Sequence, residues 1–260
     1  MARSCSSTAG RRKSELGTRE GIVIRHRPFN TLGRIDRAWL QARLHFRFGS
    51  IGPPEHAPLG PLYIWNDDTF APHSGFGMHA HENVEIVTIV RSGVIAHEDS
   101  VGNQARIAAG DIQVMSAGKG VLHAERNEED HAAQLFQIWL TPRSRNVEPR
   151  WAMRLITMTE RFVVLASGDV TDVEHGALEI DADARVMGAM LHAGQTEVHP
   201  IAEEAMAYLV TTTGRIRVND VDLAPRDGAA IIGERALGVT AIDETSVWLI
   251  ELPRRPCAET

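Results

Sequence analysis

The amino-acid sequence predicts an all-β fold built from two tandem copies of one β-barrel or sandwich unit, with few short helices. From Gly21 onward the 260-residue chain consists of short β-branched and apolar runs broken by Gly, Pro and Asp. Helix signals are nearly absent from the first half, and the strand-like runs recur at the regular spacing typical of sandwiches and barrels. The pattern of the first half returns in weakened form in the second half, which indicates a tandem repeat.

The composition excludes several classes of protein. A hydrophobic fraction of 43% and a charged fraction of 23% are typical of a soluble globular protein. The formal net charge of -7 argues against a nucleic-acid-binding surface over the whole body, so no direct nucleic-acid binding is expected. No window offers about 18 uncharged apolar residues, so no membrane span is expected. Cys5 and Cys257 stand at opposite ends of the chain, which favours a reducing, cytoplasmic setting without disulfides.

The chain begins with a segment that differs from the rest. Residues 1–20 are rich in Ser, Arg and Gly, lack the apolar stretch of a secretory signal, and are predicted to form a disordered tail. Strand signals start at residues 22–25. Residues 42–48 alternate with period two, which predicts a strand with Leu44, Phe46 and Phe48 on one apolar face. Residues 61–65 resume the strand pattern, and the polar residues 66–68 predict a turn.

The strongest strand prediction covers residues 84–90, because six of the seven carry β-branched or apolar side chains. Further strands are predicted at 94–97, 112–115 and 134–140, separated by turns at Ser92-Gly93, Gly102-Asn103 and Gly110-Asp111. The polar, proline-bounded stretch that follows is the best linker candidate. The sequence therefore predicts a first unit over residues 21–142, a linker over 143–152 and a second unit over 153–260.

The repeat is visible as an offset of residue numbers. Residues 84–97, with a glycine at 93, can be laid over residues 205–219, with a glycine at 214, at an offset of 121. Two copies of one β unit in tandem explain this economically.

Two residue pairs in the first unit predict a single metal site. His79 and His81 are two apart, as are His123 and Glu125, and residues two apart on a strand share a face. Three neutral imidazoles and one carboxylate suit Fe(II), Mn, Ni, Cu or Zn and suit Ca or Mg poorly. A His-x-His pair alone is more often two surface histidines. The conjunction of two pairs, each preceded by glycine turns, favours a site.

A second carboxylate leaves the ligand set open. On strand parity Glu85 lies on the same face as His79 and His81, so it is a candidate fourth ligand, a partner that orients an imidazole, or a general base. Spacing alone does not separate Glu85 from Glu125. The charged segment 97–99 is interpreted as a solvated strand end.

The second unit lacks the candidate ligands. Carried over by 121 residues, the positions of His79, His81 and Glu85 fall on Pro200, Ala202 and Met206, and those of His123 and Glu125 fall near Thr240 and Ile242. His199 is one residue out of register, which on a strand points it to the opposite face. The second unit is therefore predicted to be a degenerate copy without metal ligands.

The two histidine-containing motifs resemble those of the cupins. The first cupin motif is present as His79-Ala80-His81 with Glu85, and the second runs from Gly110 through His123 to Asn127, with Ser116 in place of the usual proline. More specifically the chain resembles a pirin-family bicupin, on blocks that include residues 75–81, 110–118 and 120–125 and together cover roughly residues 21–142. The second half resembles the family only in its length and in its pattern of short apolar runs broken by turn residues.

The resemblance implies two tandem cupin (jelly-roll) β-barrels and one mononuclear site. In pirins the metal is held by two histidines and a His-x-Glu pair, which here are His79, His81, His123 and Glu125. Glu85 is then a supporting carboxylate. The departures from the family are Ala80 where proline is usual, Glu82-Asn83 where Arg-Gly is common and Val114 where tryptophan is frequent. They change the wall of the pocket without removing a ligand.

The resemblance also implies alternative functions. Some pirin-like proteins are similar to quercetin 2,3-dioxygenase, which implies a divalent transition metal, with Fe first and Mn, Ni, Cu or Zn as alternatives, and a flavonol-like aromatic substrate. Glu125 would then hold the metal and take the flavonol proton. Pirins are also known as iron-dependent partners of transcription factors, which implies a protein partner and no turnover. A third hypothesis is a bicupin in which the metal is incidental. We rank the enzyme first.

Overall fold

The computed structural model describes residues 23–252. The predicted tail over residues 1–20 and both cysteines lie outside the described residues. The all-β prediction is confirmed: between residues 23 and 252 the helical elements are a single 3-10 turn, η1 (Phe29–Thr31), and one short α-helix, α1 (Val170–Glu174). Within the same range no helix is long and apolar enough to cross a membrane.

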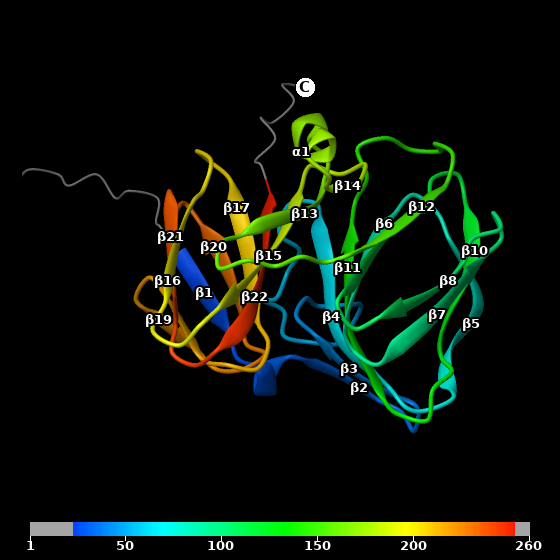
Figure 1. Cartoon of the computed structure of the whole chain (residues 1–260), viewed down its shortest axis with the longest axis horizontal. Coiled ribbons are helices and arrows are strands. Elements are labelled where there is room, and N and C mark those ends of the chain that lie inside the picture. The colour runs from blue at the N-terminus through cyan, green and yellow to red at the C-terminus, as the bar shows by residue number, and fades with distance from the viewer. Residues whose placement is uncertain (1–22, 253–260) are drawn as a thin grey trace, which may run out of the picture.

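The first unit packs a seven-stranded sheet against a four-stranded one (Figure 1). The larger sheet contains, in spatial order, β12 (Arg150–Leu155), β9 (Asp111–Ser116), β6 (Glu85–Ser92), β11 (Ala133–Leu140), β4 (Leu62–Phe70), β3 (Leu40–Leu44) and β2 (Gly33–Asp36). The smaller sheet contains β5 (Ser74–His81), β10 (Val121–Asn127), β7 (Val94–Asp99) and β8 (Gln104–Ala108).

The second unit has the same two-sheet plan. Its larger sheet contains β1 (Val23–Arg27), β20 (Gly228–Ile232), β17 (Met206–Thr211), β22 (Thr245–Leu252), β15 (Arg185–Leu191), β13 (Val163–Ser167) and β14 (Leu178–Glu179). Its smaller sheet contains β16 (Thr196–Pro200), β21 (Ala236–Ala241), β18 (Ile216–Val218) and β19 (Val221–Leu223). The matching sheet sizes and strand orders identify the two units as copies of one design, as the repeat predicts.

The two units exchange one strand each. β1 is the first strand of the described range but pairs with β20 of the second unit, and in Figure 1 it lies, blue, among the orange and red strands. β12 follows the connection between the units but pairs with β9 of the first unit. Residues 150–152, which the sequence analysis assigned to the linker, are therefore the start of a strand. The polar composition suggested a linker because β12 lies at the edge of its sheet, and edge strands often carry charged residues.

Two further local predictions need correction. The turn expected at residues 66–68 is wrong, because β4 runs through Asp67 and Asp68 without a break. Asp67 is fully buried and bonds to the guanidinium groups of Arg91 and Arg226, so its charge is compensated by residues far away in the sequence. The strand expected at 42–48 ends at Leu44, and Phe48 is exposed.

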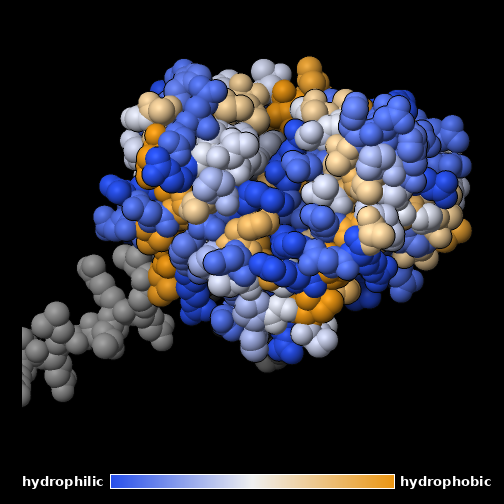
Figure 2. Space-filling model, turned by 90° about the horizontal axis from the view of Figure 1, so that it is seen from below, coloured by the Kyte–Doolittle hydropathy of each residue, from blue (hydrophilic) through white to orange (hydrophobic). Residues whose placement is uncertain are grey.

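The two larger sheets face each other across an apolar seam. One cluster of buried side chains includes residues of both units, among them Trp65 and Phe136 from the first and Tyr208 and Trp248 from the second. The Trp65 and Tyr208 rings lie 5.5 Å apart, and the phenol of Tyr208 bonds to His45 at 2.8 Å. The units are thus joined through a continuous core. On the outer surface seen in Figure 2, hydrophilic side chains predominate and hydrophobic ones are scattered in small groups.

Candidate metal centre

The structure brings the three predicted histidines together on two neighbouring antiparallel strands. His123 on β10 stands directly opposite His79 on β5, and His81 is two residues further along β5. The ring centroids are separated by 4.4 Å for His79 and His123, 4.8 Å for His79 and His81, and 4.9 Å for His81 and His123. A ligand nitrogen of each ring lies within 4.8 Å of the others, as adjacent ligands of one cation require.

The protonation of these rings suits a metal. Burial, together with the neighbouring imidazoles, lowers the pKa of His123 to about 3 and that of His81 to about 4. Both rings are therefore neutral at physiological pH. The carbonyl of Gly77 accepts a hydrogen bond of 2.8 Å from Nδ1 of His79, which leaves Nε2 of that ring with a lone pair. Nε2 of His81 and both ring nitrogens of His123 are buried without a hydrogen-bond partner. Such unpaired buried nitrogens are suited to bind a cation.

Glu125 stands beside this cluster and is fully buried. One of its carboxylate oxygens lies within 4.8 Å of ring nitrogens of His123 and His97. The carboxylate accepts hydrogen bonds from Gln113 at 2.7 Å, from Thr88 at 3.3 Å and from Gln137. Burial raises the pKa of Glu125 to about 7, and these neutral donors only partly oppose the rise.

Two indole groups fix the direction of the amides that hold Glu125. The Trp151 indole donates to the carbonyl oxygen of the Gln113 side chain at 2.8 Å, and Trp139 donates to that of Gln137 at 3.2 Å. Each amide therefore turns its NH2 group toward Glu125. Trp151 belongs to β12, so a residue that the sequence analysis placed in the linker supports the centre.

Glu85 does not belong to this cluster. Its carboxylate accepts a hydrogen bond from Ser116 at 2.6 Å and another from the backbone of Asp181 in the second unit at 3.0 Å. The strand-parity prediction is wrong because parity holds only within one strand. β5 ends at His81, Asn83 turns the chain with a φ of 51°, and Glu85 opens β6 in the other sheet.

The prediction of a solvated strand end at residues 97–99 is wrong for His97, because this side chain is buried beside the histidine cluster. Its ring stacks on Trp151 with centroids 5.3 Å apart, and its Nε2 lies 3.2 Å from Asp99. Asp99 also accepts three backbone N–H groups of the following loop, from Val101 to Asn103. The period-two alternation of β7 could have predicted this burial, because the apolar residue Ile95 shares a face with His97 and Asp99.

A mostly apolar pocket of about 240 Å³ opens beside His79 and His81. Its walls come from β2 to β5 and β11 and include Ile35, Leu40, Leu44, Phe48, Ile64, Phe76 and Trp139. Asp68 is a buried carboxyl in this wall, and its Oδ1 has no hydrogen-bond partner. Burial, together with the nearby charges of Asp67 and Glu125, raises the pKa of Asp68 well above its ordinary value, so it is held in the neutral form.

Comparison with known proteins covers both units. The family model described as Pirin matches residues 25–140, and a model described as the quercetinase C-terminal cupin domain matches residues 164–252. A protein of Caulobacter vibrioides named pirin-like protein is 43% identical over 232 residues, which cover 88% of this chain and 99% of that protein. The quercetin 2,3-dioxygenase of Escherichia coli K12 is 32% identical over 232 residues, which cover 89% of this chain and 99% of that protein.

A solved structure matches at the level of the whole chain. The crystal structure of the bacterial pirin YhhW from Escherichia coli in complex with nickel(II) superposes with a TM-score of 0.84 and 31% sequence identity, covering 90% of this chain and 100% of that one.

Proposed function

The chain belongs to the pirin family, and on this premise we propose that it is a metal-dependent dioxygenase of the quercetin 2,3-dioxygenase type. The expected two-cupin architecture is confirmed, and the second half, whose resemblance was weak, matches a cupin model of its own. The observation that carries the proposal is the group of three imidazoles beside an apolar pocket, with unpaired buried nitrogens on His81 and His123.

A divalent metal is the cofactor that this donor set and the nickel-containing relative support. We propose His79, His81, His123 and Glu125 as its ligands, with Fe as the native metal and Mn, Ni, Cu or Zn as alternatives. When bound, the metal supplies positive charge and open coordination positions for catalysis. His97 contacts the site from the side opposite β5, where Asp99 and Trp151 hold it.

The chain's own residues suit an aromatic, hydroxylated substrate. Apolar and aromatic side chains such as Phe76 and Trp139 line the pocket and would exclude water from a flat ring system. The neutral carboxyl of Asp68 can donate a hydrogen bond to a substrate oxygen. We propose Glu125 as the group that takes the proton of the flavonol hydroxyl, since it is a buried carboxylate next to the His123 imidazole.

The overall reaction balances without another oxidant. Two carbon–carbon bonds of the flavonol's central ring break, one ring carbon leaves as carbon monoxide, and both atoms of dioxygen end in the remaining ester. Dioxygen is reduced as the ring carbons are oxidised. A reducing, cytoplasmic setting, which the two terminal cysteines favour, remains part of the proposal.

The test is to load the protein separately with Fe, Mn, Ni, Cu and Zn and to supply quercetin. At least one form should consume one molecule of dioxygen for each carbon monoxide released, as measured with an oxygen electrode and a carbon monoxide assay. His123→Ala should abolish turnover. His175→Ala, which removes the exposed histidine that follows α1, is the matched control and should retain turnover. Absence of turnover in all five metal forms would overturn the proposal.

A further inference from the structure

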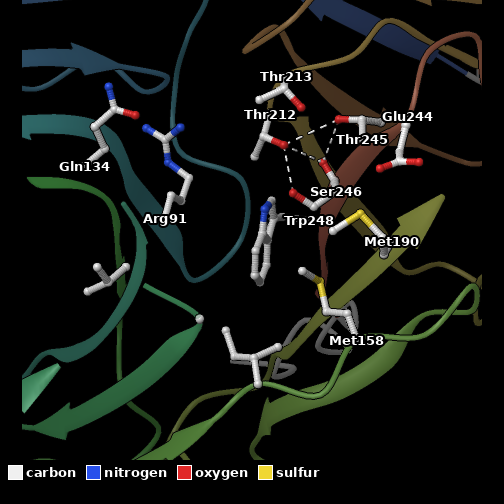
Figure 3. Close-up of a pocket in the computed structure, with 13 residues that line it drawn as sticks. Arg91, Gln134, Met158, Met190, Thr212, Thr213, Glu244, Thr245, Ser246 and Trp248 are labelled. Carbon is white, nitrogen blue, oxygen red and sulfur yellow. Dashed lines mark hydrogen bonds between the residues drawn. The ribbon is translucent and has the colours of Figure 1, made fainter. Parts of the chain in front are cut away.

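A second cavity lies between the two units and shares no lining residue with the pocket beside the histidines. Its volume is about 560 Å³, within the range of roughly 300–1,000 Å³ typical of small-molecule sites. Arg91 on β6 and Gln134 on β11 bound it on the side of the first unit (Figure 3). Met190 on β15 and Trp248 on β22 bound it on the side of the second unit. Small-molecule sites occur preferentially at such junctions between domains.

Three side chains that line the cavity carry a hydrogen-bond donor without a partner among the described residues. Nε of Arg91 is buried and has no hydrogen-bond partner, and Nε1 of the Trp248 indole, a side chain only 3% exposed, has none either. The side-chain amide of Gln134 makes no hydrogen bond to any residue in the described range. Buried donors such as the Arg91 and Trp248 nitrogens are normally satisfied, so these two suit an acceptor on a bound molecule.

The charge at the first-unit end of the cavity is positive. The carboxylate of Asp67 bonds to Arg91 and also to Arg226 at 2.7 Å, so one buried carboxylate is shared by two guanidinium groups. The Arg91 guanidinium also packs over the face of the Phe136 ring, with its Cζ 4.3 Å from the ring centroid. An arginine held in this way is preorganised to meet a carboxylate.

The rest of the cavity is apolar except at its far rim. The thioethers of Met158 and Met190 and the Trp248 ring form its wall, and thioethers make favourable contacts with aromatic rings. The Thr212 hydroxyl bonds to the hydroxyl groups of Thr245 and Ser246, as the dashed lines of Figure 3 mark. Glu244, at the same rim, bonds to His192 at 3.1 Å. Its carboxylate disfavours an anion at that end, so an anionic ligand would have one orientation.

We propose that this cavity is a binding site for a small aromatic carboxylate. The carboxylate is held by Arg91 and Gln134, and the aromatic body lies against Met158, Met190 and Trp248. This inference does not depend on the proposed activity, because the site is separate from the metal centre.

The probe for the test is 2-naphthoate, with its neutral amide, 2-naphthamide, as the matched ligand. Calorimetry on the folded wild-type protein should give saturable one-to-one binding of the carboxylate, with at least tenfold weaker binding of the amide. Gln134→Glu places a negative charge beside Arg91 and should weaken naphthoate binding at least tenfold. Glu244→Gln is the control at the opposite rim and should leave the affinity equal or higher. Thermal melts establish that each variant is folded.

Thr213→Phe provides a second, independent variant, because Thr213 is exposed at the rim and a phenyl group there narrows the cavity. It should also weaken binding, and metal-loaded and metal-free protein should bind naphthoate alike. The proposal is overturned if naphthoate does not saturate the wild type, if Gln134→Glu binds it as well as wild type does, or if bound metal abolishes the binding.

Discussion

Binding of a divalent metal should displace a proton from Glu125, and this proton can be counted. Burial raises the pKa of the Glu125 carboxyl to about 7, whereas a metal ligand must be deprotonated. With that pKa about 0.9 of the carboxyl is protonated at pH 6, about 0.5 at pH 7 and about 0.1 at pH 8. Glu125 should release these fractions of a proton for each metal ion bound.

The buried imidazoles should contribute little to this count. Burial lowers the pKa of His81 to about 4 and that of His123 to about 3, so both rings are already neutral at pH 6. Glu125→Gln keeps all three imidazoles and removes the titrating carboxyl. Subtracting its proton count from that of the wild type therefore isolates Glu125.

The assay is calorimetric titration with Ni²⁺ in buffers of different ionisation enthalpy at each pH. The wild type should release about 0.9, 0.5 and 0.1 protons more than Glu125→Gln at pH 6, 7 and 8 respectively. A difference that is absent at pH 6, or that grows toward pH 8, would refute the assignment of Glu125 as a ligand.

The same carboxyl should make the metal-free protein less stable as the pH rises. Its pKa is about 7 in the folded chain against an ordinary value of 4.5, so the unfolded chain ionises first. The stabilising contribution is complete below pH 4.5 and is lost by pH 7, and this interval corresponds to about 3 kcal/mol. Urea unfolding of metal-free wild type at pH 5 and pH 8 measures the loss. The Glu125→Gln variant should lack it, and equal pH dependence in both proteins would contradict the linkage.

Three further substitutions have defined outcomes. Asp68→Asn should raise the stability of the metal-free protein at pH 8 by about 1–3 kcal/mol, because the carboxyl is buried without a partner, and the gain should vanish near pH 3; no gain in a thermal melt at pH 8 would contradict this. Gly75→Ala should destabilise the chain by about 3 kcal/mol or more, because the new Cβ would lie 2.3 Å from the Glu125 carbonyl oxygen, while Gly77→Ala on the same strand should be nearly neutral; similar melts for both would argue against it. Glu85→Gln should leave the Ni²⁺ affinity, measured by calorimetry, within about twofold of wild type. It should reduce the free energy of unfolding by about 1 kcal/mol, because Glu85 bonds to Ser116 and to the Asp181 backbone. A tenfold loss of Ni²⁺ affinity would instead indicate that Glu85 is a metal ligand.

The features that sequence predicted well are those that local patterns encode. Period-two spacing places His79 with His81 and His123 with Glu125, and the strands are long enough to keep that parity. The alternation of apolar runs with glycine turns is likewise local, so the all-β class and the repeat could be predicted. Parity failed for Glu85 because the turn at Asn83 intervenes.

The features that sequence missed depend on partners far along the chain. Asp67 resembles a turn residue until Arg226, 159 residues away, is seen to bond to it. Trp151 resembles part of a linker until β12 pairs with β9 and brings the indole to Gln113. A buried charge and a polar edge strand are thus recognisable only once their tertiary partners are known, which short-range patterns do not contain.

The exchanged strands set an order of events during synthesis. β12 completes the first unit, including the Trp151 contact to the metal centre, before most of the second unit has been made. β1 has to wait, since His26 and its partner Asp227 are 201 residues apart, which at about 5–20 residues per second is roughly 10–40 s. Over that interval β1 lacks its partner β20, and the charges of Arg25 and Arg27 discourage its pairing with other nascent chains. Of the described strands, β1 is therefore synthesised first but pairs only after β20 has been made, and its charged residues suit that delay.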